Sequence, residues 1–96
     1  MQLSFGWDKE KAKKNLLKHN VSFEEAMSVW KDEFAAFLYD DFHSGEEDRY
    51  LMIGYSSKNN LLIVSFAERS GVIRIISSRK ATKNERNKHE ENRGKY

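Results

Sequence analysis

The chain has 96 residues and a formal net charge of +2, which is the size of one small domain. It contains no cysteine, so disulfide scaffolds, thiolate metal sites and cysteine nucleophiles are excluded. None of its apolar runs, such as 61–64, approaches the ~20 residues of a membrane-spanning helix. Since the first residues also lack the apolar core of a signal peptide, we expect a soluble cytoplasmic protein without a membrane partner.

The net charge conceals an uneven distribution of charge along the chain. Residues 1–20 sum to +3, residues 21–50 to −7 and residues 51–96 to +6. Two basic segments around an acidic one indicate a polyanionic partner, with chance clustering of surface charge as the alternative. We expect the acidic segment to lie away from the face that meets the polyanion.

The first third of the chain predicts one strand and two helices. Alternating apolar residues indicate a short strand over 3–7. A helix over 8–18 begins at an aspartate that is a good N-cap. The pattern Ser22-x-x-Glu25 is a capping box, in which the serine accepts from the third helical N–H and the glutamate reaches back. It predicts a second helix over 23–31.

The rest of the chain predicts four strands and a final helix. The expected strands, separated by an acidic loop over 40–49 and by two tighter turns, span 35–39, 50–56, 61–68 and 72–77. A second capping box, Thr82-x-x-Glu85, predicts a helix over 83–91. The order therefore predicts an α+β domain with an antiparallel sheet of four to five strands, two N-terminal helices and one C-terminal helix.

The turn before the last strand decides which charged residues share a face of the sheet. A three-residue loop, 69–71, would put Gly71 in the left-handed conformation and make Glu68 and Arg74 diagonal neighbours. A two-residue loop would put them on opposite faces. We expect the three-residue loop. Glu68 and Arg74 would then form either an ordinary salt bridge of the sheet or a functional pair.

A cationic sheet face that carries a carboxylate could cleave RNA without a metal ion. A base takes the proton of the ribose 2′-hydroxyl, cations stabilise the charge on phosphorus and an acid protonates the departing 5′-oxygen. Glu68 could be the base, and Arg74 and Arg79 could hold the phosphate. His19 or Lys80 could be the acid.

Aromatic and histidine residues add further candidates. Trp7 or Tyr55 could stack on a base of single-stranded RNA, although each is also a reasonable core residue. The three histidines lack the spacing of metal ligands, so we expect neither a metal nor a cofactor. His43 and His89 are expected to be exposed and uninvolved.

Five blocks of the sequence together resemble the BrnT family of toxins from type II toxin–antitoxin systems. The resemblance extends over about residues 5–88, and its blocks occur in the same order as in the family: 5–8, 18–26, 49–54, 68–82 and 85–86. Two positions depart from the family pattern. Gly6 stands where the family usually has an acid, and Asn20 stands where it usually has glycine.

The resemblance implies a single RelE-like domain over 1–91, followed by a frayed tail at 92–96. It implies an endoribonuclease that inhibits translation and is neutralised by a BrnA-type antitoxin with a ribbon-helix-helix domain. Promoter DNA would be bound only through that antitoxin. The resemblance implies an active face with Glu68, Arg69, Arg74 and Arg79. It also implies that Trp7 and His19 stand at family-typical positions. We expect RNA contacts from Trp7, Arg69, Lys80, Lys83 and Arg86.

Two other functions compete with this interpretation. The first is a non-catalytic module that binds nucleic acid or protein within a repressor complex. The second is a toxin of the same fold class that acts on a protein such as DNA gyrase. Fold alone does not choose among them. The cluster of Glu68 and Arg69 with Arg74 and Arg79 nearby favours the ribonuclease.

Overall fold

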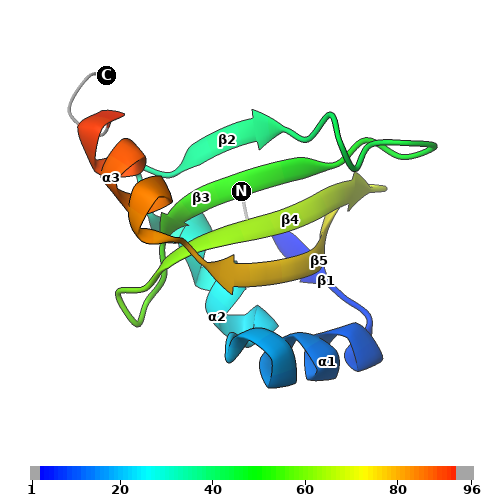
Figure 1. Ribbon diagram of the computed structural model, residues 1–96. Helices are drawn as coiled ribbons and strands as arrows, with labels where there is room; N and C mark the ends of the chain where they lie inside the picture. The colour runs from blue at the N-terminus through cyan, green and yellow to red at the C-terminus, as the bar shows by residue number, and fades with distance from the viewer. Residues whose placement is uncertain (1–2, 93–96) are drawn as a thin grey trace.

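The computed structural model describes residues 3–92 and has the predicted α+β class (Figure 1). Its elements in chain order are β1 (Ser4–Gly6), α1 (Lys9–His19), α2 (Phe23–Met27), the 3-10 helix η1 (Ser28–Lys31), β2 (Ala36–Tyr39), β3 (Tyr50–Tyr55), β4 (Leu61–Arg69), β5 (Val72–Lys80) and α3 (Lys83–Asn92). In this part of the chain, no helix is long and apolar enough to cross a membrane. Of the expected tail at 92–96, Asn92 is the last residue of α3, and the other residues lie outside the described ones.

The five strands form one sheet in the order β1-β5-β4-β3-β2. The four strands from β2 to β5 make the predicted antiparallel meander. β1 differs, because Ser4–Gly6 pairs with Val72–Arg74 in parallel, so the sheet is mixed rather than antiparallel throughout. A tight turn fixes the direction of a hairpin strand, but no turn joins β1 to β5, and local sequence carries no signal for their relative direction.

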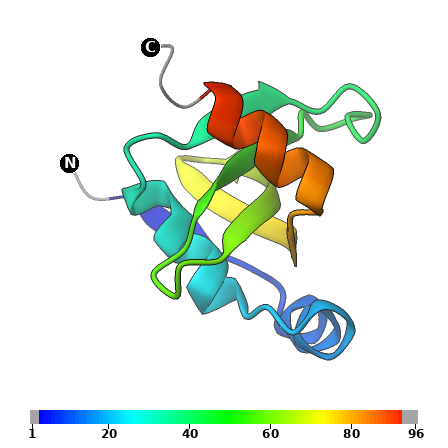
Figure 2. The same ribbon diagram turned by 60° about the vertical axis from the view of Figure 1, so that its left-hand side comes forward.

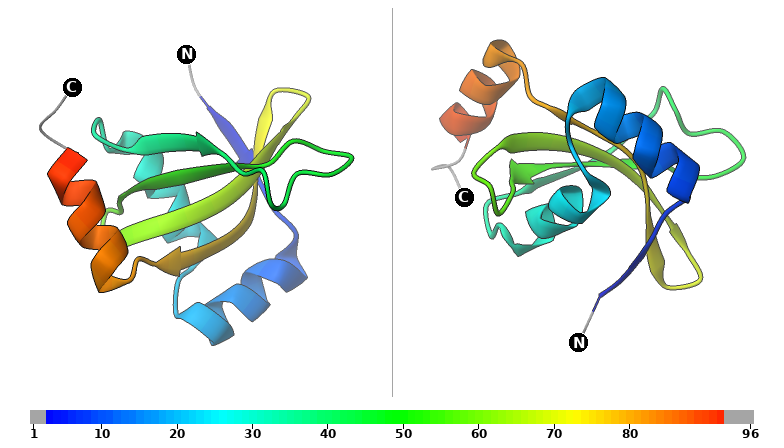
Figure 3. Two further views of the ribbon diagram at one scale, coloured as in Figure 1. Left: turned by 45° about the horizontal axis from the view of Figure 1, so that its top comes forward. Right: turned by 90° about the horizontal axis from the view of Figure 1, so that it is seen from below.

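The helices lie on different sides of the sheet (Figure 3, right). α2 lies on one side, whereas α1 and α3 flank the other side. We call the first side the α2 face; Leu62, Val64, Phe66, Ile73 and Ile75 of β4 and β5 point to it. We call the second side the groove face; it carries Ile63, Ser65 and Ala67 of β4. Figure 2 shows α3 in front of one end of the sheet and α2 on its other side.

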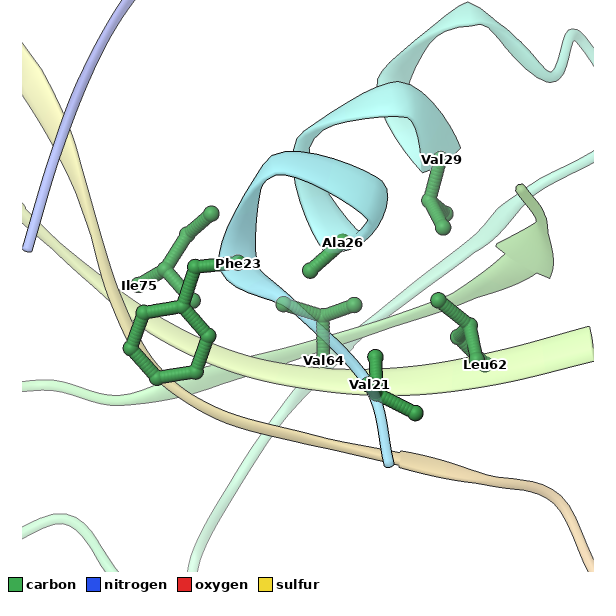
Figure 4. Close-up of a cluster of buried hydrophobic side chains, with 7 residues drawn as sticks. All are labelled: Val21, Phe23, Ala26, Val29, Leu62, Val64 and Ile75. Carbon is green, nitrogen blue, oxygen red and sulfur yellow. The ribbon is translucent and has the colours of Figure 1, made fainter. Parts of the chain in front are cut away.

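The main core fills the space between α2 and the sheet (Figure 4). Seven side chains with exposed fractions of 1% or less form it: Val21, Phe23, Ala26, Val29, Leu62, Val64 and Ile75. Trp30 packs edge-on against Phe5 and Phe66, which extends the core toward β1. Burying a large apolar side chain contributes about 1.5–3 kcal/mol, so this cluster fixes which face of the sheet meets α2.

The caps of the first two helices follow the sequence, with one exception. Asp8 accepts hydrogen bonds from the N–H groups of Glu10 and Lys11 at 2.8 and 3.1 Å, and Ser22 accepts one from Glu25 at 3.0 Å. The Glu25 carboxylate does not close the predicted capping box. It is buried and accepts instead from Ser56 Oγ at 2.6 Å and Asn60 Nδ2 at 2.9 Å. Glu25 therefore ties α2 to the β3–β4 turn.

The β4–β5 turn has two residues, so the predicted three-residue loop is wrong. Arg69 pairs with Val72, and both Ser70 and Gly71 adopt positive φ values of 52° and 81°. Two consecutive left-handed residues make a type I′ turn, whose twist matches that of the flanking strands. Glu68 consequently pairs with Ile73 on the α2 face. The expected pairing of Glu68 with Arg74 does not occur, since Arg74 pairs with Ala67 on the groove face.

A β-bulge in β5 turns the side chain of Arg79 to the groove face. Phe66 pairs with Ile75 and Ser65 with Ser77, which leaves Ile76 as the extra residue. In a regular strand, side chains five residues apart point to opposite faces. The extra residue shifts this alternation, so Arg79 pairs with Ile63 and shares the groove face with Arg74.

Candidate active site

The groove face contains a hollow of about 350 Å³ that brings together residues from four parts of the chain. α1 contributes His19, the residue just before β3 is Arg49, and β5 contributes Arg79. The loop after β2 contributes Asp40, Phe42 and His43. The floor consists of sheet residues: Leu51, Ile63, Ser65, Ile76, Ser77 and Ser78. We call this hollow the groove.

His19 reaches the groove because α1 is fixed to the edge of β5. β1 covers that edge only at Val72–Arg74. Beyond it, the buried amide of Asn15 donates to Ser78 O at 2.8 Å and accepts from Ser78 N at 3.0 Å, as a neighbouring strand would. Its Nδ2 also donates to Val21 O at 2.9 Å. His19 lies one helical turn after Asn15 and therefore next to Ser77.

Arg79 is oriented by the first turn of α3. Its guanidinium donates two hydrogen bonds to the Glu85 carboxylate, at 2.8 and 2.9 Å. This pairing raises the pKa of Arg79. The same hydrogen bond lowers the pKa of Glu85 from 4.5 to about 2, against the opposing effect of desolvation. The predicted capping box is complete here, since Thr82 N donates to Glu85 Oε1 at 2.8 Å and Glu85 N donates to Thr82 Oγ1 at 3.2 Å.

His43 and Asp40 form a pair at the other side of the groove. His43 Nδ1 lies 2.8 Å from Asp40 Oδ2, and Asp40 is buried. Asp40 Oδ1 also accepts from the N–H groups of Phe42 and His43, at 3.2 and 3.3 Å. An ionised carboxylate only accepts, so the pair fixes the proton on Nδ1 and leaves Nε2 of the imidazole for other contacts.

Sequence reasoning missed several residues of the groove. His43 was expected to be uninvolved, and neither Asp40 nor Arg49 was considered, yet all three line the groove. The expectation that the acidic segment lies away from this face is wrong for the same reason. The one available signal was the spacing of Asp40 and His43, which places a carboxylate within reach of an imidazole in a turn. His89, also expected to be exposed, is the buried residue of α3.

Two predicted arginines share the face but lie outside the groove. Arg69 donates to both carboxylate oxygens of Glu47 at 2.7 Å, which raises the pKa of Arg69 and lowers that of Glu47. This contact ties the loop over 40–49 to the end of β4. Arg74 is half-buried opposite Ala67. Hydrogen bonds are the main cause of the lowered pKa of Asp8 and of Glu47, and the positive charge of Arg74 lowers both pKa values further.

Glu68 and Trp7 lie away from the groove. Glu68 lines a separate hollow on the α2 face, with Phe37, Tyr50 and Phe66 among its neighbours. The sheet therefore separates it from Arg79. Trp7 is half-buried, contacts Phe23 edge-on with ring centroids 5.9 Å apart, and packs against the main core.

The remaining predicted residues surround α3. Lys80 ends β5, and Lys83 and Arg86 lie on the first two turns of α3, all three exposed. Tyr55 packs under this helix, with its ring 6.1 Å from that of His89 and its hydroxyl bonded to Glu90. These lysine and arginine side chains add positive charge to the end of the sheet where Arg79 lies.

Comparison with known proteins finds one matching family and a similar crystal structure. The family model described as "Ribonuclease toxin, BrnT, of type II toxin-antitoxin system" matches residues 7–85. The crystal structure of the Brucella abortus ribonuclease toxin BrnT is similar, with a TM-score of 0.65 and 21% sequence identity over 85% of this chain and 100% of that chain. At that identity the likeness shows a shared fold. No curated protein sequence matches the chain.

Proposed function

The chain belongs to the BrnT family of ribonuclease toxins of type II toxin–antitoxin systems, and from this premise we propose that it cleaves RNA in the groove without a metal ion. The observation that carries the proposal is the convergence of two imidazoles, His19 and His43, with two guanidiniums, Arg49 and Arg79, in one hollow. Imidazoles exchange protons near neutral pH, and guanidiniums bind phosphate oxygens in pairs. RNA cleavage through the 2′-hydroxyl requires both kinds of group.

The reaction transfers phosphorus from the 5′-oxygen to the 2′-oxygen of the ribose. A base removes the proton of the 2′-hydroxyl, the 2′-oxygen bonds to phosphorus, and the bond from phosphorus to the 5′-oxygen breaks as an acid protonates that oxygen. The products carry a 2′,3′-cyclic phosphate and a 5′-hydroxyl. Cations that face the phosphate stabilise the charge that develops in the transition state.

We assign the proton transfers to the two histidines and the phosphate to the two arginines. His43, oriented through Nδ1 by Asp40, acts as the base, and His19 acts as the acid, as the sequence suggested. Arg79, held by Glu85, contacts the phosphate together with Arg49. Glu68 has no part in this scheme because it lies on the α2 face.

Cationic residues outside the groove contribute to RNA binding. Arg69, Arg74, Lys83 and Arg86 contact the RNA backbone through charge, which makes their contribution dependent on salt. Lys80 pairs with Leu62 of the α2 face, so it has no RNA contact in this scheme. Trp7 packs edge-on against Phe23, so we assign it no base-stacking role.

The partner and the cellular effect come from the family. The family description implies an antitoxin and an RNA target. We propose a ribbon-helix-helix antitoxin of the BrnA type, through which alone the complex contacts promoter DNA. We propose also that RNA cleavage inhibits translation in the cytoplasm.

Cleavage of a labelled single-stranded RNA by the purified chain tests the ribonuclease proposal. We expect cleavage in the presence of EDTA, and product ends with a 2′,3′-cyclic phosphate and a 5′-hydroxyl. Arg79→Ala should abolish cleavage. A chain that binds the RNA but leaves it intact would favour the non-catalytic module, and cleavage that requires added Mg²⁺ would contradict the metal-free scheme.

A further inference from the structure

The exposed apolar side chains of the chain gather along one strand. Among the described residues, eight large apolar side chains are exposed, and five of them fall within residues 34–42: Phe34, Phe37, Leu38, Tyr39 and Phe42, with exposed fractions of 44, 58, 48, 48 and 96%. We call residues 34–42 the β2 edge. Single exposed apolar residues are ordinary on a protein surface, whereas a contiguous group marks an interaction site.

The backbone of the β2 edge is open to a further strand. β2 is the last strand in the sheet order, and Figure 1 shows it as the outermost strand at the top. Leu38 pairs with Leu51, and Asp40 N donates to Arg49 O at 2.9 Å. Alternate residues of an antiparallel pair hydrogen-bond to the partner strand. Phe37 and Tyr39 therefore direct their backbone N–H and C=O groups away from β3.

The charge around the β2 edge selects the kind of partner. Residues 32–48 contain seven aspartates and glutamates and no lysine or arginine. Asp40 is buried against His43 and Glu47 is paired with Arg69, which leaves exposed carboxylates at Glu33, Asp41, Glu46 and Asp48. The exposed carboxylates would attract a basic protein segment. β2 itself lacks the lysine or proline that commonly protects an edge strand from pairing.

We propose that the β2 edge receives an extended segment of the antitoxin that carries apolar residues flanked by lysine or arginine. The segment adds a strand beside β2 and pairs with the outward backbone groups of Phe37 and Tyr39. Its apolar side chains cover those of Phe37 and Tyr39 on one face and that of Leu38 on the other. This inference relies on the proposed function only for the existence of an antitoxin.

A strand bound beside β2 would also block access of RNA to the groove. β2 continues directly into Asp40, Phe42 and His43, which line the groove. Phe42 is 96% exposed at that place. A strand that follows β2 beyond Tyr39 therefore lies at the mouth of the groove and obstructs RNA without contacting Arg79.

Amide hydrogen exchange tests the added strand. This chain is co-expressed with the product of the neighbouring reading frame, and the exchange rates of the complex are compared with those of the free chain. We expect the amides of Phe37 and Tyr39 to exchange about 100-fold more slowly, or slower still, in the complex. Unchanged exchange at both amides in a stable complex would overturn the proposal.

Charge and apolar substitutions test the chemistry of the partner. Glu33→Lys combined with Asp41→Lys should weaken the complex by about 10–100-fold, as should Leu38→Lys. Matched controls are Glu24→Lys on α2 and Leu17→Lys on α1, both at exposed positions away from β2, and these should bind normally. Equal weakening by the controls would contradict the proposed surface.

Other outcomes identify other occupants. Protection of Phe37 and Tyr39 in the free chain that grows with protein concentration would show a second copy on the β2 edge and overturn the proposal. Protection by added RNA would overturn it too. RNA cleavage is measured in parallel for every β2 variant, so loss of antitoxin binding with retained cleavage separates this proposal from the ribonuclease assignment.

Discussion

The two faces of the sheet differ in what they bury. The α2 face meets α2 through Leu62, Val64 and Ile75, whose exposed fractions are 1% or less. The groove face carries His19, Arg49 and Arg79 around a hollow of about 350 Å³. The α2 face carries the main core, whereas the groove face holds polar groups beside a smaller buried cluster of Leu61, Ile63 and Ala81. Substitutions on the two faces should therefore separate stability from activity.

The largest expected effect is on the groove face. His19→Ala should lower the cleavage rate by about 10²–10⁴-fold, because that is the usual contribution of a positioned acid. The free energy of unfolding should change by less than about 0.5 kcal/mol, since His19 makes no buried contact that holds the core. Initial rates of RNA cleavage and urea denaturation measure the two effects. A folded variant with wild-type rate would remove His19 from the site.

The matching substitution on the α2 face should do the reverse. Leu62 is fully buried, and Leu62→Ala leaves a cavity that should lower the free energy of unfolding by about 2–5 kcal/mol. The cleavage rate per folded molecule should stay within about twofold, as the groove does not contain Leu62. Urea denaturation and rates corrected for the folded fraction test this. A large loss of rate in fully folded protein would show that the two faces are coupled.

A substitution of Asn15 should lower both stability and activity, unlike the substitutions of His19 and Leu62. The Asn15 side chain makes three hydrogen bonds that fix α1 to β5. Asn15→Ala leaves Ser78 N–H and C=O unpaired in a buried position, which should cost about 1–3 kcal/mol. Because His19 lies on the same helix, cleavage should fall as well. Lys14→Ala, at an exposed position of α1, is the control and should change neither quantity.

Glu85 offers a smaller, pH-dependent effect. Its folded pKa of about 2 lies below its ordinary value of 4.5. The pair with Arg79 therefore stabilises the fold fully above pH 4.5, and this contribution is lost as the pH falls from there toward 2. Since the two side chains are 36% and 42% exposed, solvent screening limits the contribution to about 1 kcal/mol or less.

Glu85→Gln is the corresponding experiment. The variant should be less stable than the native chain by up to about 1 kcal/mol near neutral pH, and the difference should vanish near pH 2. Urea denaturation at the two pH values gives the comparison. A difference that persists unchanged at the lower pH would mean that the ion pair is not its source.

The two capping boxes show what local sequence can and cannot predict. Both patterns correctly predicted a helix start, because an N-cap depends on residues that are adjacent in the chain. Their glutamates differ, since Glu85 closes its box and holds Arg79, whereas Glu25 binds Ser56 and Asn60 across the fold. The partner of a side chain that points away from its own helix depends on the tertiary structure, which local sequence does not reveal.

The groove was predicted in part for a related reason. His19 and Arg79 were both expected at the site, and the structure brings them together. Their meeting depends on the bulge at Ile76 and on the amide of Asn15, and neither has a signature in the sequence. Asp40 and His43 were missed because a loop shows no periodicity from which its position relative to the sheet could be inferred.

The smallest expected effect comes from the residue that sequence reasoning proposed as the base. Glu68 lies on the α2 face, because the two-residue turn at Ser70 and Gly71 pairs it with Ile73. It is exposed and lines a hollow that the sheet separates from Arg79. Glu68→Gln should therefore leave both the cleavage rate and the free energy of unfolding within about twofold and about 0.5 kcal/mol of the native values.

This substitution discriminates between the two faces more directly than a loss of activity does. A loss of cleavage in His19→Ala is compatible with several arrangements of the remaining groups, whereas retained cleavage in Glu68→Gln shows directly that Glu68 is not the base. His43→Ala completes the comparison, since it should lose cleavage where Glu68→Gln retains it. If Glu68→Gln were inactive and His43→Ala active, RNA would have to reach the end of β4 from the α2 face, and the base would be Glu68 after all.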